Sequence, residues 1–414
     1  MTRLPSWYHL IVGKLTGLIE NNPHEPFQMS HDFLYLDNNA STAPLSEVLT
    51  AVTEGMSTWG NPASAHDAGR LAAEQIERAR ESVSGLVGAR PGQVVFTSGA
   101  TEANNLALRG LWEASRMTVP ERTQIVVGAT EHPAVLEVAD WLAKAGAEVV
   151  IVPVDRSGLI DLNVLEDAVS DKTLLVSVMA ANNETGVVAP VNAVVQIAHA
   201  VGAYVHSDAT QMVGRLPLSF VDLELDLLSL SGHKMHGPKG VGALIASRRA
   251  PIAPQVLGGG HERGIRSGTL NTPGIVGLGV AAELADASPA TSAEVEALRD
   301  RLVARLAQAL GDVEVNGAAA PRLPNTANLQ FAGAEAEAVM ANMPEVACSS
   351  GSACSSAIPR PSHVLLAMGL THEEASQSLR FSLSRFTTAG EVDEAVARTS
   401  AAVENVRHLT GWRG

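Results

Sequence analysis

The chain has 414 residues, of which 46% are hydrophobic and 18% charged, and its formal net charge is −15. This length and composition indicate a folded globular protein with room for two domains, and they exclude an intrinsically disordered chain. The acidic balance excludes a general basic surface for nucleic acid, so we expect no direct nucleic-acid binding. We also expect no association with a membrane, because no apolar run approaches the length of a membrane span.

The chain has two cysteines, Cys348 and Cys354. Two cysteines do not form a disulfide framework in a chain of this length, and a free thiol is typical of the cytoplasm. A single disulfide between the two cysteines is the alternative. The first residues are not typical of a signal peptide, because His9 and Lys14 interrupt the apolar stretch. We therefore expect a cytoplasmic enzyme or binding protein, and we predict no metal site.

Residues 1–33 form an N-terminal extension before the first predicted core elements. Apolar residues recur at helical spacing in this extension, so a short amphipathic helix is expected at 6–20. A short strand near Tyr35 then leads into a polar, turn-prone segment. The apolar positions between Leu71 and Leu86 predict a long amphipathic helix over 64–86.

From Val94 onward, short apolar runs alternate with helical patterns. Strands are predicted at 94–96, 125–127, 148–152, 174–179, 204–208, 225–230 and 241–245. Helices are predicted at 103–112, 133–145, 161–169 (capped by Asp161) and 191–200. This alternation indicates right-handed crossovers and a mostly parallel sheet with helices on both faces. In such sheets ligands bind at the carboxyl ends of the strands, so the residues there are the functional candidates.

After about residue 290 the elements become shorter and the pattern changes. Helices are predicted at 293–310, 335–341 and 362–368, strands at 313–315, 327–331 and 379–383, and a last helix after the capping box Thr388–Glu391. We predict that residues 46–289 form a large domain. Residues 34–45 and 290–414 are predicted to form a smaller α/β domain.

One strand end carries the sequence Ser231-Gly232-His233-Lys234 and is followed by a turn with Gly and Pro. Lysine is scarce in this chain, with five in total. A lysine at such a place can form a Schiff base with a carbonyl cofactor, which needs an amine that is partly desolvated and held still. An ordinary loop lysine fits the short motif equally well, so the other strand ends must decide.

The other strand ends supply groups that suit one cofactor. The segment Thr97–Glu102 joins a strand to a helix N-terminus and predicts a phosphate cradle, although Ser and Thr also serve as plain helix caps. His132 can stack on an aromatic ring, or it is a loop histidine bonded to backbone. A carboxylate at the position of Asp208 needs a cationic partner, such as a protonated pyridine nitrogen, and Gln211 can reach the phenolic oxygen of such a ring. With Lys234, these groups predict pyridoxal 5′-phosphate.

Ten segments also match the motifs of one enzyme group. They are Leu36–Thr42, Gly60–His66, Phe96–Glu102, Thr130–His132, Asn182–Gly186, Asp208–Gln211, Ser231–Lys234, Gly258–Thr269, Ser349–Cys354 and Leu379–Ser382. On these motifs the chain resembles the cysteine desulfurases of the class V aminotransferase-like group, the type that serves nitrogen fixation and iron–sulfur assembly. The resemblance implies the fold of pyridoxal-phosphate-dependent transferases (aspartate aminotransferase-like, fold type I), an α/β fold with a large, mostly parallel sheet domain and a smaller α/β domain.

By this resemblance, Lys234 is expected to be the Schiff-base lysine and Cys354 the catalytic nucleophile, with His132 as a stacking and catalytic residue. Arg380 is expected to bind the substrate carboxylate with help from Asn183, a task that suits a planar guanidinium. The expected cofactor-binding residues are Ala100, Thr101, His132, Asn183, Asp208, Gln211, Ser231, His233, Lys234 and Thr269.

The residues around the two cysteines favour the same nucleophile. Removal of sulfur from cysteine needs a group that takes the Sγ as it leaves, and a thiolate does so by forming a persulfide. Cys354 lies among Gly, Ala and Ser residues, in a segment that we expect to be mobile. Cys348 follows Val346 and Ala347 and has the pattern of a buried small hydrophobe. A resolving or disulfide role for Cys348 is the alternative.

The resemblance implies conversion of L-cysteine to L-alanine, with the sulfur passed through Cys354 to an acceptor protein. Thr269 looks like the family residue that reaches the phosphate of the neighbouring subunit, which implies a homodimer with shared active sites. Housekeeping members carry a longer C-terminal tail that contacts the iron–sulfur scaffold protein, whereas this chain ends at Gly414 soon after its last helix. A tRNA-thiolation, DNA-sulfur or cofactor pathway protein is therefore an alternative acceptor.

Three other functions stay open at this point. A selenocysteine lyase or cysteine sulfinate desulfinase would use the same scaffold, whereas an aminotransferase would give Cys354 no role. A sulfur-relay scaffold without activity has no need for Lys234, Asp208, Cys354 and Arg380, so their presence in one chain favours an enzyme.

Overall fold

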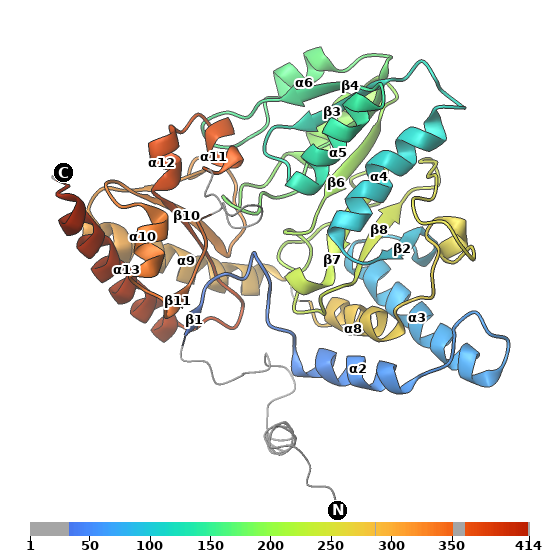
Figure 1. Cartoon of the computed structure of the whole chain (residues 1–414), viewed down its shortest axis with the longest axis horizontal. Helices are drawn as coiled ribbons and strands as arrows, with labels where there is room; N and C mark the ends of the chain where they lie inside the picture. The colour runs from blue at the N-terminus through green and yellow to red at the C-terminus, as the bar shows by residue number, and fades with distance from the viewer. Residues whose placement is uncertain (1–32, 286, 351–360, 413–414) are drawn as a thin grey trace, which may run out of the picture.

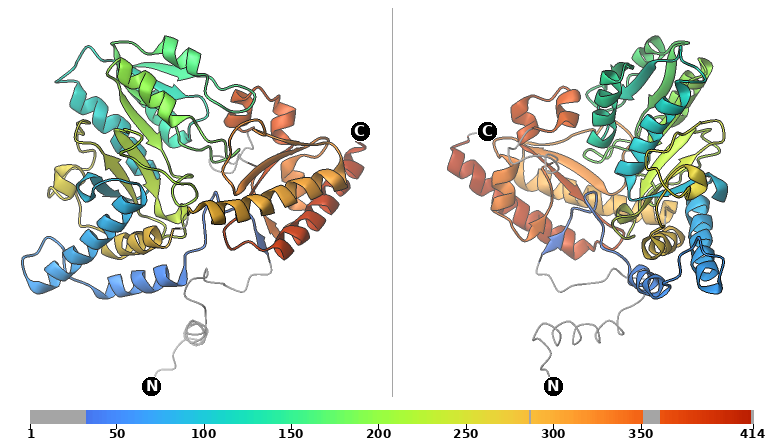
Figure 2. Two further views of the ribbon diagram at one scale, coloured as in Figure 1. Left: turned by 180° about the vertical axis from the view of Figure 1, so that it is seen from behind. Right: turned by 45° about the vertical axis from the view of Figure 1, so that its right-hand side comes forward.

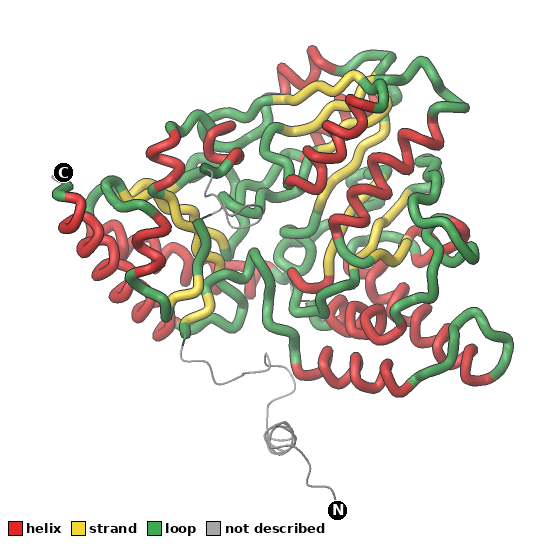
Figure 3. The backbone as a smooth tube through the Cα atoms, viewed as in Figure 1, coloured by secondary structure: helices red, strands yellow, loops and turns green. Residues whose placement is uncertain are grey.

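The computed structural model describes residues 33–285, 287–350 and 361–412. The helix expected at 6–20 and the residue Cys354 lie outside the described residues. The strands form two main groups, a large sheet and a smaller one, with helices packed around each (Figures 1 and 3). Among the described helices, none combines the length and the apolar character needed to cross a bilayer.

The large sheet has seven strands in the order β2-β8-β7-β6-β5-β3-β4. They are β2 (Val94–Thr97), β3 (Gln124–Gly128), β4 (Glu148–Val152), β5 (Thr173–Ser177), β6 (Tyr204–Asp208), β7 (Leu227–Ser231) and β8 (Gly242–Ala246). The pairings from β4 across to β7 are all parallel, whereas β8 is antiparallel to both β2 and β7. The prediction of a mostly parallel sheet is therefore confirmed.

Successive residues of strands such as β2 and β3 enter two separate hydrophobic cores. Val94 and Phe96 pack in the core that contains α3 (Asp67–Leu86), α6 (Leu162–Ala168), α7 (Val191–Ala200) and α8 (Thr272–Glu283). Val95, which lies between them, packs instead with α4 (Ala100–Ser115) and α5 (Pro133–Lys144). Because alternate side chains of a strand point to opposite faces, helices cover both faces of the sheet.

The smaller sheet is antiparallel, with the strand order β12-β10-β9. Its strands are β9 (Val313–Val315), β10 (Thr326–Phe331) and β12 (Ser378–Ser382), and its core is completed by α9 (Pro289–Leu310), α10 (Ala336–Ala341) and α13 (Ala389–Thr410). Beside it, β1 (Leu34–Tyr35) pairs with β11 (Val346–Ala347). The strand near Tyr35 thus joins the C-terminal part of the chain, as expected, while the domain boundaries stay a prediction.

Helix α9 links the two groups of elements. It begins near the large sheet, where Ser292 Oγ donates to the carbonyl of Arg215 at 3.1 Å, and it runs along the smaller sheet (Figure 2).

Three helices were not expected from the sequence: α2 (Ser46–Ser57), α8 and α12 (His372–Ser376). Two further helix starts agree with the sequence, because Asp161 caps α6 and Thr388 forms a capping box with Glu391 at α13.

A buried ion pair joins the glycine-rich segment to the large sheet. Arg80 of α3 donates to the two carboxylate oxygens of Glu262 at 2.9 and 2.7 Å, and Glu262 also accepts the backbone N–H of Phe96 at 2.8 Å. The two charged side chains are only 5% and 2% exposed. Since each charge would be costly to bury alone, the two residues depend on each other.

We predict that Glu262→Ala lowers the free energy of unfolding by about 3–5 kcal/mol, because it leaves the Arg80 charge buried without its partner. Glu77 bonds the same guanidinium at 3.0 Å but is 62% exposed, so Glu77→Ala is the matched control and should cost about 1 kcal/mol or less. Equilibrium unfolding in urea, followed by circular dichroism, measures both losses. Equal losses for the two variants would contradict the prediction.

Candidate active site

The direction of the strands brings most of the predicted site residues to one edge of the large sheet. Strands β3, β5, β6 and β7 run parallel, and β2 runs the same way because β8 is antiparallel to both β2 and β7. Their carboxyl ends therefore lie at the same edge. His132 follows β3, Asn183 follows β5, Asp208 ends β6, Ser231 ends β7 and Thr101 follows β2.

Asp208 is a buried carboxylate, 6% exposed, whose hydrogen-bond donors are neutral. Asn104 Nδ2 donates to its Oδ2 at 2.7 Å, and the backbone N–H of Thr210 donates to its Oδ1 at 3.0 Å. Within the described residues, no cationic side chain forms an ion pair with Asp208. A buried carboxylate with neutral donors alone attracts a cationic partner, such as a protonated ring nitrogen.

His132 lies at the start of α5 as a neutral imidazole. Burial lowers its pKa; the charge of Asp208 opposes this shift, and Lys234 and His363 add to it. Its Nδ1 accepts the backbone N–H of Ala134 at 3.1 Å, so in the neutral ring the proton is on Nε2. The ring is thus fixed by the helix start and retains one N–H donor.

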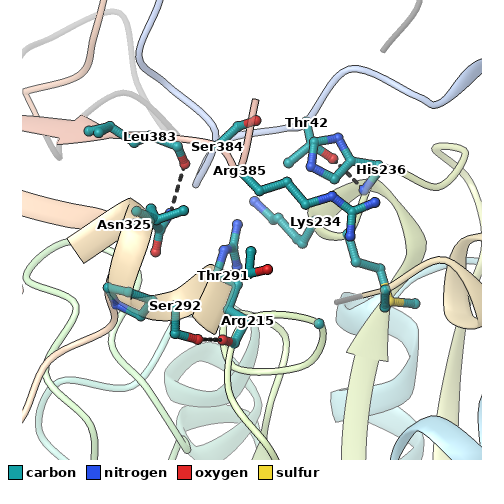
Figure 4. A pocket seen from close by; sticks show the side chains of 15 residues that line it. Thr42, Arg215, Lys234, His236, Thr291, Ser292, Asn325, Leu383, Ser384 and Arg385 are labelled. Carbon is teal, nitrogen blue, oxygen red and sulfur yellow. Dashed lines mark hydrogen bonds between the residues drawn. The ribbon is translucent and has the colours of Figure 1, made fainter. Parts of the chain in front are cut away.

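Lys234 is held on the segment that follows β1. It ends the short 3-10 helix η3 (Gly232–Lys234), and its Nζ donates to the carbonyls of Asn39 at 2.6 Å and Ala40 at 2.8 Å. Together with Arg215 and Arg385, Lys234 lines a cavity of about 50 Å³ between the large sheet and the start of α9 (Figure 4).

Two hydrogen bonds fix which end of the Gln211 amide is oxygen and which is nitrogen. Arg215 can only donate, and it binds Gln211 Oε1 at 3.0 Å, while Gln211 Nε2 donates to the carbonyl of Asn39 at 3.0 Å. Gln211 is buried, so these bonds are shielded from water. The predicted ring residue is therefore connected to the same backbone carbonyl as Lys234.

The predicted phosphate cradle is built from small residues. Gly99, before Ala100 and Thr101 at the start of α4, has φ 151, and a Cβ added there would lie 3.7 Å from Ser231 Oγ. Burial lowers the pKa of the nearby His233 to about 4, so its ring is neutral at neutral pH. Backbone N–H groups at a helix start beside hydroxyl groups suit an anion.

Thr269 is exposed at the end of the glycine-rich segment, and within the described residues its side chain makes no hydrogen bond. The segment is nevertheless bound to the cradle. Arg266 donates to the two carboxylate oxygens of Glu102 at 2.8 and 3.2 Å, and Glu102 lies in the first turn of α4.

Arg380 of β12 reaches the edge of the large sheet from the smaller one. Its Nη1 donates to the carbonyl of Asn183 at 2.9 Å, and its Nη2 donates to Asp37 Oδ1 at 2.6 Å. Its Nε is buried without a partner, which leaves a donor for a carboxylate. Cys348 lies nearby, and burial raises the pKa of its thiol to about 12.

A family model for class V aminotransferases matches residues 34–395 of the chain. A cysteine desulfurase from Frankia sp. (strain EuIK1) is 47% identical over 394 residues, covering 91% of this chain and 93% of that protein. The chain belongs to the class V aminotransferase family. Among solved structures, a NifS-like protein has a TM-score of 0.83 at 36% identity, covering 90% of this chain and 100% of its own. SspA in complex with cysteine has a TM-score of 0.76 at 34% identity, covering 86% of this chain and 99% of its own.

Membership of this family confirms the predicted fold and the predicted cofactor, because class V aminotransferases depend on pyridoxal 5′-phosphate. The residues present fit that group. Asp208 is a buried carboxylate with neutral donors alone, as a ring nitrogen requires, and Lys234 supplies the amine. Gly242 lets the backbone at the start of the cradle approach β8 closely, because a Cβ on Gly242 would lie 2.7 Å from the Cα of Gly99.

Several residues of this site were missed by sequence reasoning. Asn104 lies inside a predicted helix and Asp37 and Arg380 are 343 residues apart, so neither contact leaves a local signal. Glu131 was passed over beside His132. It is 1% exposed, its Oε1 accepts the backbone N–H of Met179 at 2.5 Å, and its Oε2 is buried without a partner.

We predict that Glu131→Gln makes folding stability less dependent on pH. Burial raises the pKa of Glu131 well above its usual value, the N–H of Met179 opposes the shift, and the charge of Asp208 adds to it. The folded chain therefore holds this proton more tightly than the unfolded chain. As the pH rises above the pKa of Glu131 in the unfolded chain, the wild type loses the free energy of unfolding that this proton contributes. The variant has no proton to release there, so its stability does not change for this reason.

The thermal midpoints of the two proteins, measured from pH 5 to pH 8, should diverge in favour of the variant as the pH increases. The exposed Glu137→Gln on α5 controls for the loss of a carboxylate as such. A constant difference between wild type and Glu131→Gln over this range would contradict a neutral Glu131.

Proposed function

We propose that the chain is a cysteine desulfurase that converts L-cysteine to L-alanine and transfers the sulfur to Cys354 as a persulfide. The relatives support the substrate class, and one observation in this chain supports it most. Lys234 and Arg380 are joined through Asn39 and Asn183 by three hydrogen bonds, from Nζ to the Asn39 carbonyl, from Asn39 Nδ2 to the Asn183 carbonyl, and from Arg380 to the same carbonyl. An amino-acid substrate needs a group that reacts with its amine and a group that binds its carboxylate in the same site, and this chain of bonds links two side chains of those kinds.

The proposed roles follow from the chemistry of each side chain. When bound, pyridoxal phosphate supplies an electron-accepting ring that acidifies the α-proton of an amino acid. With the group bound, Lys234 would take that proton at Nζ, Asp208 would keep the ring nitrogen protonated, and His132 would stack on the ring. Gln211 binds the phenolic oxygen, and Arg380 with Asn183 binds the substrate carboxylate. The phosphate is assigned to Ala100, Thr101, Ser231 and His233.

The sulfur step balances without an external oxidant. The Cys354 thiolate attacks the Sγ of the substrate and the Cβ–Sγ bond breaks, so that Cys354 carries the persulfide. The carbon product becomes L-alanine when Cβ takes up a proton and Cα regains the proton that Lys234 removed. Two residues that flank positions 351–360, Ser349 and Ser362, support the role of Cys354 because they bond to residues at the predicted site. Ser349 pairs with the backbone of Arg380 at 3.2 and 2.6 Å, and Ser362 Oγ donates to Glu184 at 2.5 Å.

The partners are part of the proposal. A homodimer would let Thr269, which is exposed and lies on a segment bound to the cradle, reach the phosphate of the neighbouring subunit. An acceptor protein, such as an iron–sulfur scaffold, would take the sulfur from Cys354. The free thiol of Cys348 supports a cytoplasmic location.

The assay that tests this function measures L-alanine and sulfide released from L-cysteine in the presence of a thiol reductant. The wild type should release the two products in equal amounts, and Cys354→Ala should release neither, because no thiolate accepts the sulfur. Cys348→Ala is the matched control and should retain activity, since the high pKa of Cys348 keeps it from acting as a nucleophile. Loss of both products in Cys348→Ala but not in Cys354→Ala would overturn the assignment.

A further inference from the structure

Asn39 is a buried residue whose polar groups are all hydrogen-bonded. It lies between β1 and α2 and is 1% exposed. Its side-chain Nδ2 donates to the carbonyl of Asn183 at 3.1 Å and to Thr326 Oγ1 at 2.9 Å, and its Oδ1 accepts from Asn325 Nδ2 at 3.0 Å. The amide therefore uses both donors and its acceptor, which leaves a single orientation.

The backbone of Asn39 is equally engaged. Its carbonyl accepts from Lys234 Nζ at 2.6 Å and from Gln211 Nε2 at 3.0 Å, and its N–H donates to Ser382 Oγ at 2.9 Å. One residue thus contacts the predicted Schiff-base lysine, the predicted ring residue and β12, the strand that carries Arg380.

The partners of Asn39 come from both sheets. Lys234, Gln211 and Asn183 follow strands of the large sheet, whereas Thr326 and Ser382 belong to β10 and β12 of the smaller one. Because these bonds are buried, breaking one of them leaves a polar group without water to replace its partner. The side-chain amide of Asn39 is therefore a fixed spacer between the two halves of the predicted site.

We propose that Asn39 is a positioning residue, whose amide sets the place of the Asn183 carbonyl and of the Arg380 guanidinium bound to it, relative to the amine of Lys234. The inference rests on the proposed function, because it assigns the substrate carboxylate to Arg380. It adds that affinity for the carboxylate depends on a residue that does not touch the substrate. Asn39→Asp is a direct test, since it keeps the size of the side chain but replaces its two N–H donors by an oxygen. That oxygen would face the two present acceptors, the Asn183 carbonyl and Thr326 Oγ1.

A merely structural Asn39 would also be buried and bonded, so a matched control is required. Asn38 is 3% exposed, and its Nδ2 donates to the carbonyls of Ser382 at 2.9 Å and Tyr35 at 3.4 Å. Its side chain contacts no predicted site residue of the large sheet. Asn38→Ala therefore removes a buried amide from the adjacent position without loosening Asn183.

The experiment uses the full chain loaded with pyridoxal phosphate. For the wild type, Asn39→Ala, Asn39→Asp and Asn38→Ala, it measures the thermal midpoint, kcat and KM for L-cysteine, and the affinity for L-alanine from the change in the yellow absorbance of the cofactor. The two Asn39 variants should raise KM and weaken L-alanine binding by about tenfold or more. Asn38→Ala should lower the thermal midpoint while its KM and L-alanine affinity stay near those of the wild type.

Two outcomes would overturn the inference. One is an Asn39→Asp variant with wild-type KM and L-alanine affinity, and the other is an Asn38→Ala variant with the same KM increase as Asn39→Ala. If the Asn39 variants do not fold, Thr326→Val keeps the shape of the side chain and removes one acceptor of the amide. It should raise KM by about threefold, roughly the cost of one weakened hydrogen bond, and an unchanged KM would count against the inference.

Failure of the proposed function gives a different result. A wild type that releases no L-alanine from L-cysteine would contradict the desulfurase assignment. The L-alanine titration would still test Asn39, because it requires binding of an amino-acid carboxylate and no turnover.

Discussion

The parallel direction of β3, β5, β6 and β7 is the constraint on which the site depends. It gathers polar residues at one edge of a sheet whose faces are both covered by helices, and the carboxyl groups of Asp208, Glu131 and Glu184 are buried there. Asp208 receives two hydrogen bonds, from Asn104 and from a backbone N–H, whereas Glu131 receives one. Burial and the charge of the nearby Asp208 raise the pKa of Glu131 well above its usual value, while the backbone N–H of Met179 opposes the shift.

The second half of the site is brought in by a segment near the start of the chain. Asp37 pairs with Arg380, and Asn39 binds residues after strands of the large sheet. The first of these contacts joins residues 343 positions apart. Because such contacts close long loops, the site forms only when both sheets are already in place.

Much of the fold follows from local patterns. The strand runs, the cap of α6 and the capping box of α13 have clear sequence signals, and the strand-end rule leads directly to Asp208 and Lys234. Helix α8 begins at an N-cap, Asn271, but it has no amphipathic pattern, because its sequence is apolar and glycine-rich on all sides and it is buried between α2 and α3. The bonds of Asn39, Asn104 and Asp37 depend on tertiary packing, which no local pattern encodes. The residues proposed to carry the chemistry could thus be named from the sequence, whereas the residues that hydrogen-bond to them could not.

The partly buried position of Cys348 has a practical consequence for chemical labelling. A thiol with a pKa of about 12 has almost no thiolate at neutral pH, and thiolates are the species that alkylating reagents attack. Brief alkylation at neutral pH should therefore leave the thiol of Cys348 largely unmodified.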